Sequence, residues 1–239
     1  MANQFGRAGK STRKMAQTRR QSAMWMVIIG LVAIGVIYFL LQNSTSLGIS
    51  GIGLLVLIVI MRLVPEFVDS LSRKKFIEEK RAIRGAKAEE KIGGLLDDLP
   101  EEFYILNDIE SPFGNIDHIV ISKNTGVFLI ETKAHGGKVE VTNETLLVNG
   151  KLPEKDFVAQ VLRNTYWLRD EIDQIIGSKP WITPVIVFVN AFVSPARPIK
   201  GISIVNKKYL PEILHRIKRP NPINSQIWEH REQIKSHLM

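Results

Sequence analysis

The stretch Ile116–Lys133 reads Ile-Asp-His-Ile-Val-Ile-Ser-Lys-Asn-Thr-Gly-Val-Phe-Leu-Ile-Glu-Thr-Lys. Two runs of β-branched and aromatic residues flank a Lys-Asn-Thr-Gly segment, which is typical of two strands joined by a tight turn. Because side chains alternate between the faces of a strand, Glu131 and Lys133 should share one face. We therefore predict an antiparallel hairpin, in which folding at the turn brings Asp117 roughly opposite Glu131 or Thr132.

Two carboxylates and one ammonium group would then meet at the end of an otherwise apolar ladder. Isolated charges are costly to bury, so charges in that place need a reason. A divalent metal ion bound together with a phosphate group would supply one. The alternative is a cluster of salt bridges at the edge of a sheet.

The hairpin also resembles a known motif. Asp117, followed after thirteen residues by Glu131-Thr132-Lys133, is similar to the metal-binding core of PD-(D/E)xK nucleases. More narrowly, Gly-Asn-Ile-Asp-His-Ile-Val-Ile with Gly-Val-Phe-Leu-Ile-Glu-Thr-Lys resembles the nuclease-related domain (NERD) family, over roughly residues 85–214. The resemblance implies an α/β, restriction-endonuclease-like fold, in which a mixed sheet is flanked by helices.

The resemblance further implies hydrolysis of phosphodiester bonds in nucleic acid, DNA or RNA, with Mg²⁺ or Mn²⁺ as the cofactor. Mg²⁺ takes oxygen ligands and usually one or two protein carboxylates. Asp117 and Glu131 suit that role, and Glu89 would be a third ligand or an outer acid. Lys133 would orient the attacking water or stabilise the phosphate oxygens.

Glu89 falls on the apolar face of a helix predicted from Ala86. The leucines and isoleucine of that helix recur with helical spacing, and it ends before Pro100. The NERD pattern has a Glu in this helix, and Gly-Ala-Lys-Ala-Glu at 85–89 matches it. The other reading is an acid in the first helical turn, which the helix dipole favours.

A later helix carries the last candidate catalytic residue. Asp156 is a plausible N-cap for a helix that runs to about Ile176. Nucleases of this superfamily often place a helical Gln beside the metal, and the resemblance assigns Gln160 to that role. A lone Gln on a helix is otherwise a surface residue. His118 should lie on the face opposite Asp117 as a core or surface histidine, and we do not expect His135 to be a ligand.

Further strands and helices complete the predicted domain. Apolar runs predict strands at Phe103–Ile109, 184–189 and 202–205, and a short hairpin at 138–148 after a strand end at Gly136-Gly137. A helix is expected from Tyr209 to Ile217 and another at about 227–237. The run at 184–189 is nearly all apolar, which is typical of a central strand buried on both faces.

A pair of apolar segments precedes the domain. Met24–Leu41 contains no charge and nearly spans a hydrocarbon core of about 30 Å. After the polar turn 42–46, a second apolar stretch runs to Val64, with Arg62 near its end. We predict a transmembrane hairpin at residues 24–64 that contacts the lipid bilayer, although a re-entrant second segment is an open alternative. A signal peptide and a buried soluble hairpin fit less well, because the basic lead is long and the spans are apolar all round.

The charges are divided unequally along the chain. Of a net charge of +8, residues 1–23 hold six basic residues and no acid, whereas 25 basic and 24 acidic residues follow from Pro65 onward. The positive-inside rule then places both termini and the nuclease-like domain in the cytoplasm, at the inner (cytoplasmic) membrane. The near-neutral soluble part counts against tight nonspecific DNA binding. The absence of cysteine excludes disulfides and thiolate metal sites.

These observations divide the chain into five segments. A basic cytoplasmic tail (1–23) is followed by a transmembrane hairpin (24–64) and by a charged helical connector (65–84), which starts at Pro65 and breaks at Gly85. A NERD-like domain (85–217) and a C-terminal tail (218–239) complete the chain. We expect a membrane-anchored, Mg-dependent nuclease-like protein acting on the cytoplasmic side. The alternative is a catalytically inactive, membrane-tethered nucleic-acid-binding or scaffold module with the same fold. A third idea is an envelope protein whose basic tail binds anionic lipid. The sequence predicts no oligomeric state.

Overall fold

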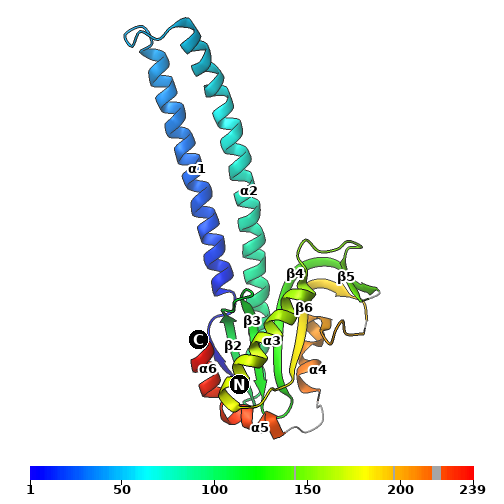
Figure 1. Ribbon diagram of the computed structural model, residues 1–239. Helices are drawn as coiled ribbons and strands as arrows, with labels where there is room; N and C mark the ends of the chain where they lie inside the picture. The colour runs from blue at the N-terminus through cyan, green and yellow to red at the C-terminus, as the bar shows by residue number, and fades with distance from the viewer. Residues whose placement is uncertain (143, 196, 217–221) are drawn as a thin grey trace. The chain divides into compact units, whose positions relative to one another are not determined.

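A computed structural model describes residues 1–142, 144–195, 197–216 and 222–239. The chain divides into two compact units. One unit, residues 12–83, consists of two long helices, and the other, residues 1–11 with 84–239, contains a mixed β-sheet and its flanking helices (Figure 1). The predicted α/β fold, preceded by two apolar helices, is thus confirmed.

The helical unit is formed by most of α1 (Lys10–Gln42) and the first part of α2 (Gly51–Asp97), which lie side by side (Figure 1). The buried residues of α1 recur every seven positions, and three of the four are small: Ala16, Ala23, Gly30 and Ile37. A Cβ atom on Gly30 would lie 2.7 Å from Val68 Cγ2. The small residues therefore allow a close approach of the two helices, in the heptad spacing of coiled coils.

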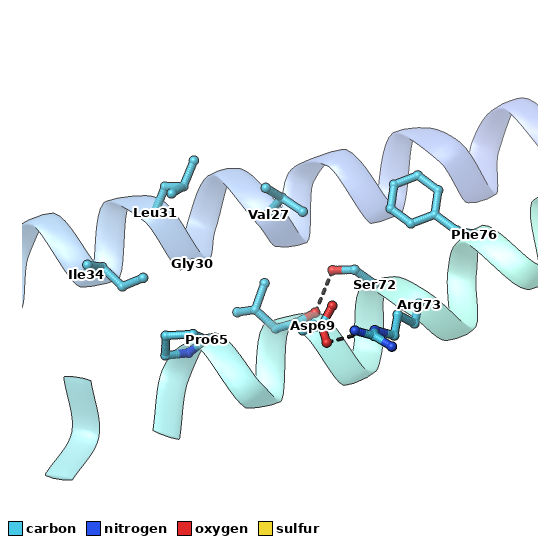
Figure 2. Close-up of a pocket in the computed structure, with 10 residues that line it drawn as sticks. Val27, Gly30, Leu31, Ile34, Pro65, Asp69, Ser72, Arg73 and Phe76 are labelled. Carbon is cyan, nitrogen blue, oxygen red and sulfur yellow. Dashed lines mark hydrogen bonds and ion pairs between the residues drawn. The ribbon is translucent and has the colours of Figure 1, made fainter. Parts of the chain in front are cut away.

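A cavity of about 310 Å³ lies between these two helices (Figure 2). Apolar residues of α1, such as Leu31, line one side of it, and Pro65 and Phe76 contribute from α2. The ion pair between Asp69 Oδ2 and Arg73 Nε, 2.8 Å, borders it. This end of the hairpin therefore combines apolar packing with charged groups of α2.

Both helices are long and apolar enough to cross a membrane. In the most apolar 18-residue stretch of α1, only 11% of the residues are buried, and in the corresponding stretch of α2 none is buried. The core helix of a soluble protein is mostly buried, so the buried soluble hairpin is not supported. A transmembrane hairpin is consistent with this structure.

Helix α2 corrects two expectations. It runs without a break from Gly51 to Asp97, so Pro65 lies inside the helix rather than at its start, and Gly85 does not end it. A glycine inside a helix costs only about 1 kcal/mol relative to alanine. Two buried alanines follow Gly85 in α2: Ala88 packs in the apolar cluster on one face of the sheet, and Ala86 lies against Gly9 of the N-terminal segment. Their packing outweighs that local cost.

The sheet has the strand order β1-β2-β3-β4-β6-β7, with β5 paired to β4. β2, β3 and β4 are antiparallel neighbours, while β1–β2, β4–β6 and β6–β7 are parallel. The strands are β1 (Asn3–Phe5), β2 (Phe103–Ile109), β3 (Ile116–Ser122), β4 (Gly126–Thr142), β5 (Thr145–Val148), β6 (Ile182–Val193) and β7 (Ser203–Asn206). The predicted hairpin is β3–β4, and β3 and β4 lie in the interior of the sheet.

Helices cover both faces of this sheet. On one face, Leu129 packs with residues of α3 (Phe157–Ile176), α5 (Pro222–Glu229) and α6 (Arg231–Leu238). On the other, Phe128 and Ile130 pack with the C-terminal part of α2 and with α4 (Leu210–His215), which follows the short helix η1 (Lys207–Tyr209). The predicted alternation of faces along β4 is confirmed.

Several boundaries differ from those expected. β4 continues past Gly136-Gly137 to Thr142. Its pairing with β6 shifts register between Lys133 and Gly136 and then continues, so the two glycines do not end the strand. The helix expected at 227–237 is divided at His230 into α5 and α6, whose Ile227 and Ile234 are buried in the core. The predicted N-cap is confirmed, since Asp156 accepts a hydrogen bond from Ala159 N–H. Residues 217–221, at the predicted end of the α4 helix and start of the tail, lie outside the described residues.

The N-terminal residues, taken from the sequence as a tail, contain β1 and the start of α1. Asp108 links this segment to the sheet. Its Oδ2 accepts from Ser11 N–H (3.0 Å), and its Oδ1 accepts from Ser11 Oγ (2.5 Å) and Asn115 Nδ2 (2.6 Å). A carboxylate in that place satisfies a donor of the first turn of α1.

Candidate active site

The β3–β4 hairpin brings the predicted charged residues together. His118 pairs with Ile130, which places Asp117 opposite Glu131. The backbone N–H of Thr132 donates to Asp117 Oδ2 at 2.6 Å, and Lys133 Nζ lies 2.5 Å from Glu131 Oε1. Asp117 is 8% exposed and Glu131 4%. Two carboxylates and one ammonium group therefore meet inside the domain, as the spacing predicted.

The position of this cluster in the sheet argues against a surface salt bridge. β3 and β4 are flanked by β2 and β6, so neither is an edge strand. β4 offers a direct comparison, because it carries a second Lys–Glu pair, between Lys138 Nζ and Glu140 Oε1 at 2.6 Å. The side chains of that pair are 56% and 37% exposed, against 12% and 5% for Lys133 and Glu131. Only the pair beside Asp117 is buried.

The electrostatic balance of the site is negative. Burial raises the pKa of Asp117 well above its ordinary value, and the nearby charges of Glu131 and Glu89 raise it further. The Lys133 ammonium and the Thr132 N–H lower the pKa but do not offset these effects. Glu89, buried on α2, therefore lies near enough to act on Asp117. At Asp117 the effects of burial and of the two neighbouring acids outweigh that of the one ammonium group, and a bound cation would relieve this imbalance.

The residues fit a divalent metal ion in a specific way. Glu131 Oε2 is buried and has no hydrogen-bond partner among the described residues, so it is available as a ligand. Within the described part of the chain, no three His, Asp or Glu side chains are gathered closely enough to hold a metal ion. Asp117 and Glu131 would supply two carboxylates, which is the number that Mg²⁺ usually takes from a protein. Glu89 lies near enough to act on Asp117 but does not form a close group of three with these two residues.

Helix α3 brings its first turns to the site. Lys133 Nζ lies 4.3 Å from the centroid of the Phe157 ring. Gln160 is one turn further on and is half-buried. Its Nε2 lies 4.0 Å from where a Cβ on Gly114 would stand, three residues before Asp117. Gln160 is therefore beside the loop that leads into β3.

Sequence reasoning missed the polar residues that hold this loop. Ser111 Oγ lies 2.8 Å from Oδ1 of Asn164, a fully buried residue of α3, and donates to Gly114 O at 2.5 Å. At the other end of the loop, Asn115 contacts Asp108. The only sequence signal for these contacts was that Asn164 follows Gln160 by four residues. This spacing places the two residues on one face of the helix, but it does not show which loop that face contacts.

The two histidines near the motif have different surroundings. His118 is fully buried on the opposite face, where its Nδ1 lies 2.6 Å from Asn107 Oδ1, and burial lowers its pKa to about 3. It is a neutral core residue, as predicted, but only one of its ring nitrogens is satisfied, because Nε2 is buried without a hydrogen-bond partner among the described residues. His135 is exposed, and its ring lies 5.4 Å from the Phe157 ring and 6.3 Å from the Phe188 ring.

Comparison with known families agrees with this geometry. Residues 84–189 match the family model described as Nuclease-related domain (NERD), a span that contains Glu89, the β3–β4 hairpin and Gln160. A search of the curated proteins and one of the solved structures each found no match. Residues 84–189 are therefore a nuclease-related domain, which implies a nuclease-like fold for that part of the chain.

Proposed function

We propose that this protein is a membrane-anchored, divalent-metal-dependent nuclease that hydrolyses phosphodiester bonds of nucleic acid on the cytoplasmic side. The observation that carries the proposal is the buried Asp117–Glu131–Lys133 cluster at the centre of the sheet of a nuclease-related domain. Charges in that position destabilise a fold unless they are compensated. A function that needs them there accounts for their presence.

Asp117 and Glu131 would hold the metal ion, Mg²⁺ or Mn²⁺, with Glu89 as the outer acid. When bound, such an ion acidifies a water molecule and neutralises charge that develops on the phosphate. The number of protein carboxylates leaves room in an octahedral shell for water and a phosphate oxygen.

The residues of the chain supply orientation. The Thr132 N–H fixes the carboxylate of Asp117, and the ion pair with Glu131 fixes the ammonium of Lys133. From that position Lys133 would donate to the attacking water or to a phosphate oxygen, because an ammonium has three donors and Glu131 Oε1 accepts one. Gln160 would act at the rim, where its amide could contact the substrate backbone.

The cytoplasmic side follows from the flanking charges. Six basic residues lie before the first apolar segment, Arg73, Lys74 and Lys75 follow the second, and the turn between the two helices carries no charge. Basic residues are retained in the cytoplasm, which puts both termini and the domain there.

A second candidate function is a membrane-tethered module that binds nucleic acid, or acts as a scaffold, without cleaving it. The observation that favours it is the near-neutral charge from Pro65 onward, 25 basic residues against 24 acidic ones. The presence of all four charged residues of the site favours the enzyme, because a module without turnover has no need of a buried cluster.

The deciding experiment uses the full chain in a neutral detergent. Labelled single- and double-stranded DNA and RNA are incubated with it in Mg²⁺, in Mn²⁺ and in EDTA. We expect cleavage only with metal. Glu131→Gln should lower the rate by about a hundredfold or more, since loss of an outer-shell partner alone costs roughly 10- to 100-fold.

The matched control is Glu140→Gln, which removes the acid of the exposed Lys–Glu pair on the same strand and should leave the rate unchanged. Equal loss in both variants would indicate a structural effect rather than a catalytic one. A folded protein that cleaves none of the substrates with either metal would leave the tethered module as the function.

A further inference from the structure

The face of β4 that carries the acid cluster becomes more exposed along the strand. Val127 and Leu129, which precede Glu131 on this face, are 1% and 0% exposed, and Glu131 itself is 4% exposed. The side chain of Lys133 is 12% exposed, and His135 is an exposed residue. A substrate would therefore reach Glu131 from the His135 end of this face, because the core covers the other end.

One buried ring of α3 holds the last two of these side chains. Phe157, the first residue of α3, is 5% exposed. Lys133 Nζ lies 4.3 Å from the centroid of the Phe157 ring, and the centroid of the His135 ring lies 5.4 Å from it. Lys133 and His135 are thus neighbours on the α3 face of the sheet, beside the acid cluster.

The backbone of β4 is irregular at this point. Between Lys133 and Gly136 the pairing with β6 shifts register, because β4 has two residues there, Ala134 and His135, where β6 has one. Asn190 Nδ2 of β6 donates to the backbone oxygen of Ala134 at 3.3 Å. An extra residue of this kind bends a strand and re-aims its side chains, and such bulges are frequent next to active sites. The irregularity therefore sets the direction of His135.

The imidazole ring of His135 has the chemistry of a phosphate contact. Even when neutral, it has one N–H donor, and hydrogen bonds to an ionised acceptor such as a phosphate oxygen are stronger than those between neutral groups. Side chains two residues apart on a strand are separated by about 6–7 Å. A phosphate held at Lys133 would therefore leave the adjoining part of the nucleic-acid backbone beside His135.

We infer that His135 is a substrate-contact residue, which donates a hydrogen bond to the phosphate next to the one presented to Asp117 and Glu131. The proposal rests on the nuclease function proposed above and adds where the substrate enters, between the end of β4 and the first turn of α3. Asn190 is a positioning residue, which acts on His135 through the backbone of Ala134.

The test compares two substitutions that separate the hydrogen bond from the ring. His135→Phe keeps an aromatic ring against Phe157 and has no N–H donor, whereas His135→Gln keeps a donor and has no ring. The full chain in neutral detergent and EDTA is titrated against fluorescent single-stranded and duplex oligonucleotides, and anisotropy is recorded. His135→Phe should bind about tenfold more weakly than the parent, the effect of one hydrogen bond to a charged group. His135→Gln should keep most of the affinity.

The matched control is His215→Phe, the same chemical change at an exposed histidine of α4, on the other face of the sheet. This variant should bind like the parent protein, and the thermal unfolding midpoints of His135→Phe and the parent should agree. Weak binding by His135→Gln together with normal binding by His135→Phe would show that only the ring matters, and would overturn the proposal. Equal affinities of His135→Phe and His215→Phe would also overturn it.

Turnover provides a second readout. A contact to a phosphate that does not react is the same in the ground state and in the transition state. In Mg²⁺, His135→Phe should therefore raise KM by about the same tenfold factor and leave kcat nearly unchanged. A fall in kcat at unchanged KM would contradict a role in substrate binding.

The outcomes separate this inference from the nuclease proposal. Oligonucleotide binding that depends on the His135 donor, without cleavage in Mg²⁺ or Mn²⁺, would support the contact and refute the enzyme. Cleavage with the same KM in His135→Phe as in the parent would support the enzyme and refute the contact. A folded parent protein that neither binds nor cleaves these oligonucleotides would refute both.

Discussion

The carboxyl group of Asp117 is held in surroundings that favour its protonated form. Burial and two neighbouring acids raise its pKa, and a single ammonium and one N–H oppose them. In the unfolded chain the same group has its ordinary pKa of 3.8. As pH rises from that value through the raised pKa, the unfolded chain loses its proton first, so the metal-free protein loses stability over this range.

Replacing Asp117 by Asn tests this balance. At pH 8 in EDTA, folding of the parent must either bury the charge of Asp117 or return a proton to its carboxyl group, and the variant has neither cost, so Asp117→Asn should raise the unfolding midpoint, by about 2–4 °C for each kcal/mol of destabilisation removed. The difference should be smaller at pH 5, because that pH lies closer to the ordinary pKa of the carboxyl group, 3.8. Adding Mg²⁺ should stabilise the parent at pH 8 and have little effect on the variant.

Thermal scans at both pH values, with and without Mg²⁺, measure these changes. Glu140→Gln, on an exposed acid of the same strand, serves as the control and should respond to Mg²⁺ like the parent. A variant that is less stable than the parent in EDTA at pH 8 would show that the site does not repel its own charges.

Sequence identified the residues of the site whose signal is local. Period-2 alternation placed Glu131 and Lys133 on one face, and the helical period placed Glu89 on a buried face. The structure confirms both placements. Phe157 beside Lys133, and Asn190 against Ala134, are contacts between segments far apart in the sequence. No periodicity within one element reports such contacts, so these residues could not be predicted.

At the scale of elements, the N-terminal strand β1 completes one edge of the sheet. It pairs in parallel with β2, and Asn107 Nδ2 of β2 donates to Phe5 O at 3.1 Å. An unpaired edge strand leaves N–H and C=O groups open to association with other chains. β1 covers that edge, so a soluble fragment that begins at residue 66 would expose it.

Gly6 follows β1 and makes the close approach possible. Its φ is +73°, and a Cβ there would collide with the backbone oxygen of Asn107. Gly150 has the same φ and open space around it. Alanine at either position has a left-handed backbone cost of about 1–2 kcal/mol, but only Gly6→Ala must also move β1 away from β2.

We therefore expect Gly6→Ala to lower the free energy of unfolding by about 1–3 kcal/mol more than Gly150→Ala, the usual cost of overpacking. Hydrogen exchange provides the second readout. The amides of β2, at residues 103–109, should exchange faster in Gly6→Ala and be unchanged in Gly150→Ala. Equal effects of the two substitutions would mean that β1 contributes nothing to the sheet.

The elements that sequence predicted well are those with long patterns. β2, β3 and the start of β4 match their expected ranges, since four or more alternating residues report a strand. β1 has three residues, too few for any period to show. The break expected at Gly85 followed local propensity, which tertiary packing of Ala86 and Ala88 overrides.

At the scale of the whole molecule, the turn between α1 and α2 is uncharged, whereas the opposite ends of these two helices carry charged residues. The turn between α1 and α2 spans residues 43–50 and has no Lys, Arg, Asp or Glu. Arg19 at the other end of α1 donates to Glu78 O of α2 at 3.1 Å, and Lys75 Nζ lies 3.6 Å from Glu78 Oε2. If the hairpin spans a bilayer, these charged ends and the turn lie on opposite sides of it.

Cysteine labelling measures this topology directly, because the natural chain contains no cysteine and every label reports the introduced one. Ser46→Cys places a thiol in the exposed turn, and Ser236→Cys places one on the exposed side of α6. A membrane-impermeant maleimide should label Ser46→Cys in intact cells and Ser236→Cys only after detergent is added, since basic flanks are retained in the cytoplasm. The reverse pattern would place the nuclease-related domain outside, away from cytoplasmic nucleic acid. Protection of both sites in intact cells, with labelling of both after detergent, would mean that the turn does not cross, and the hairpin would then be anchored from one side only.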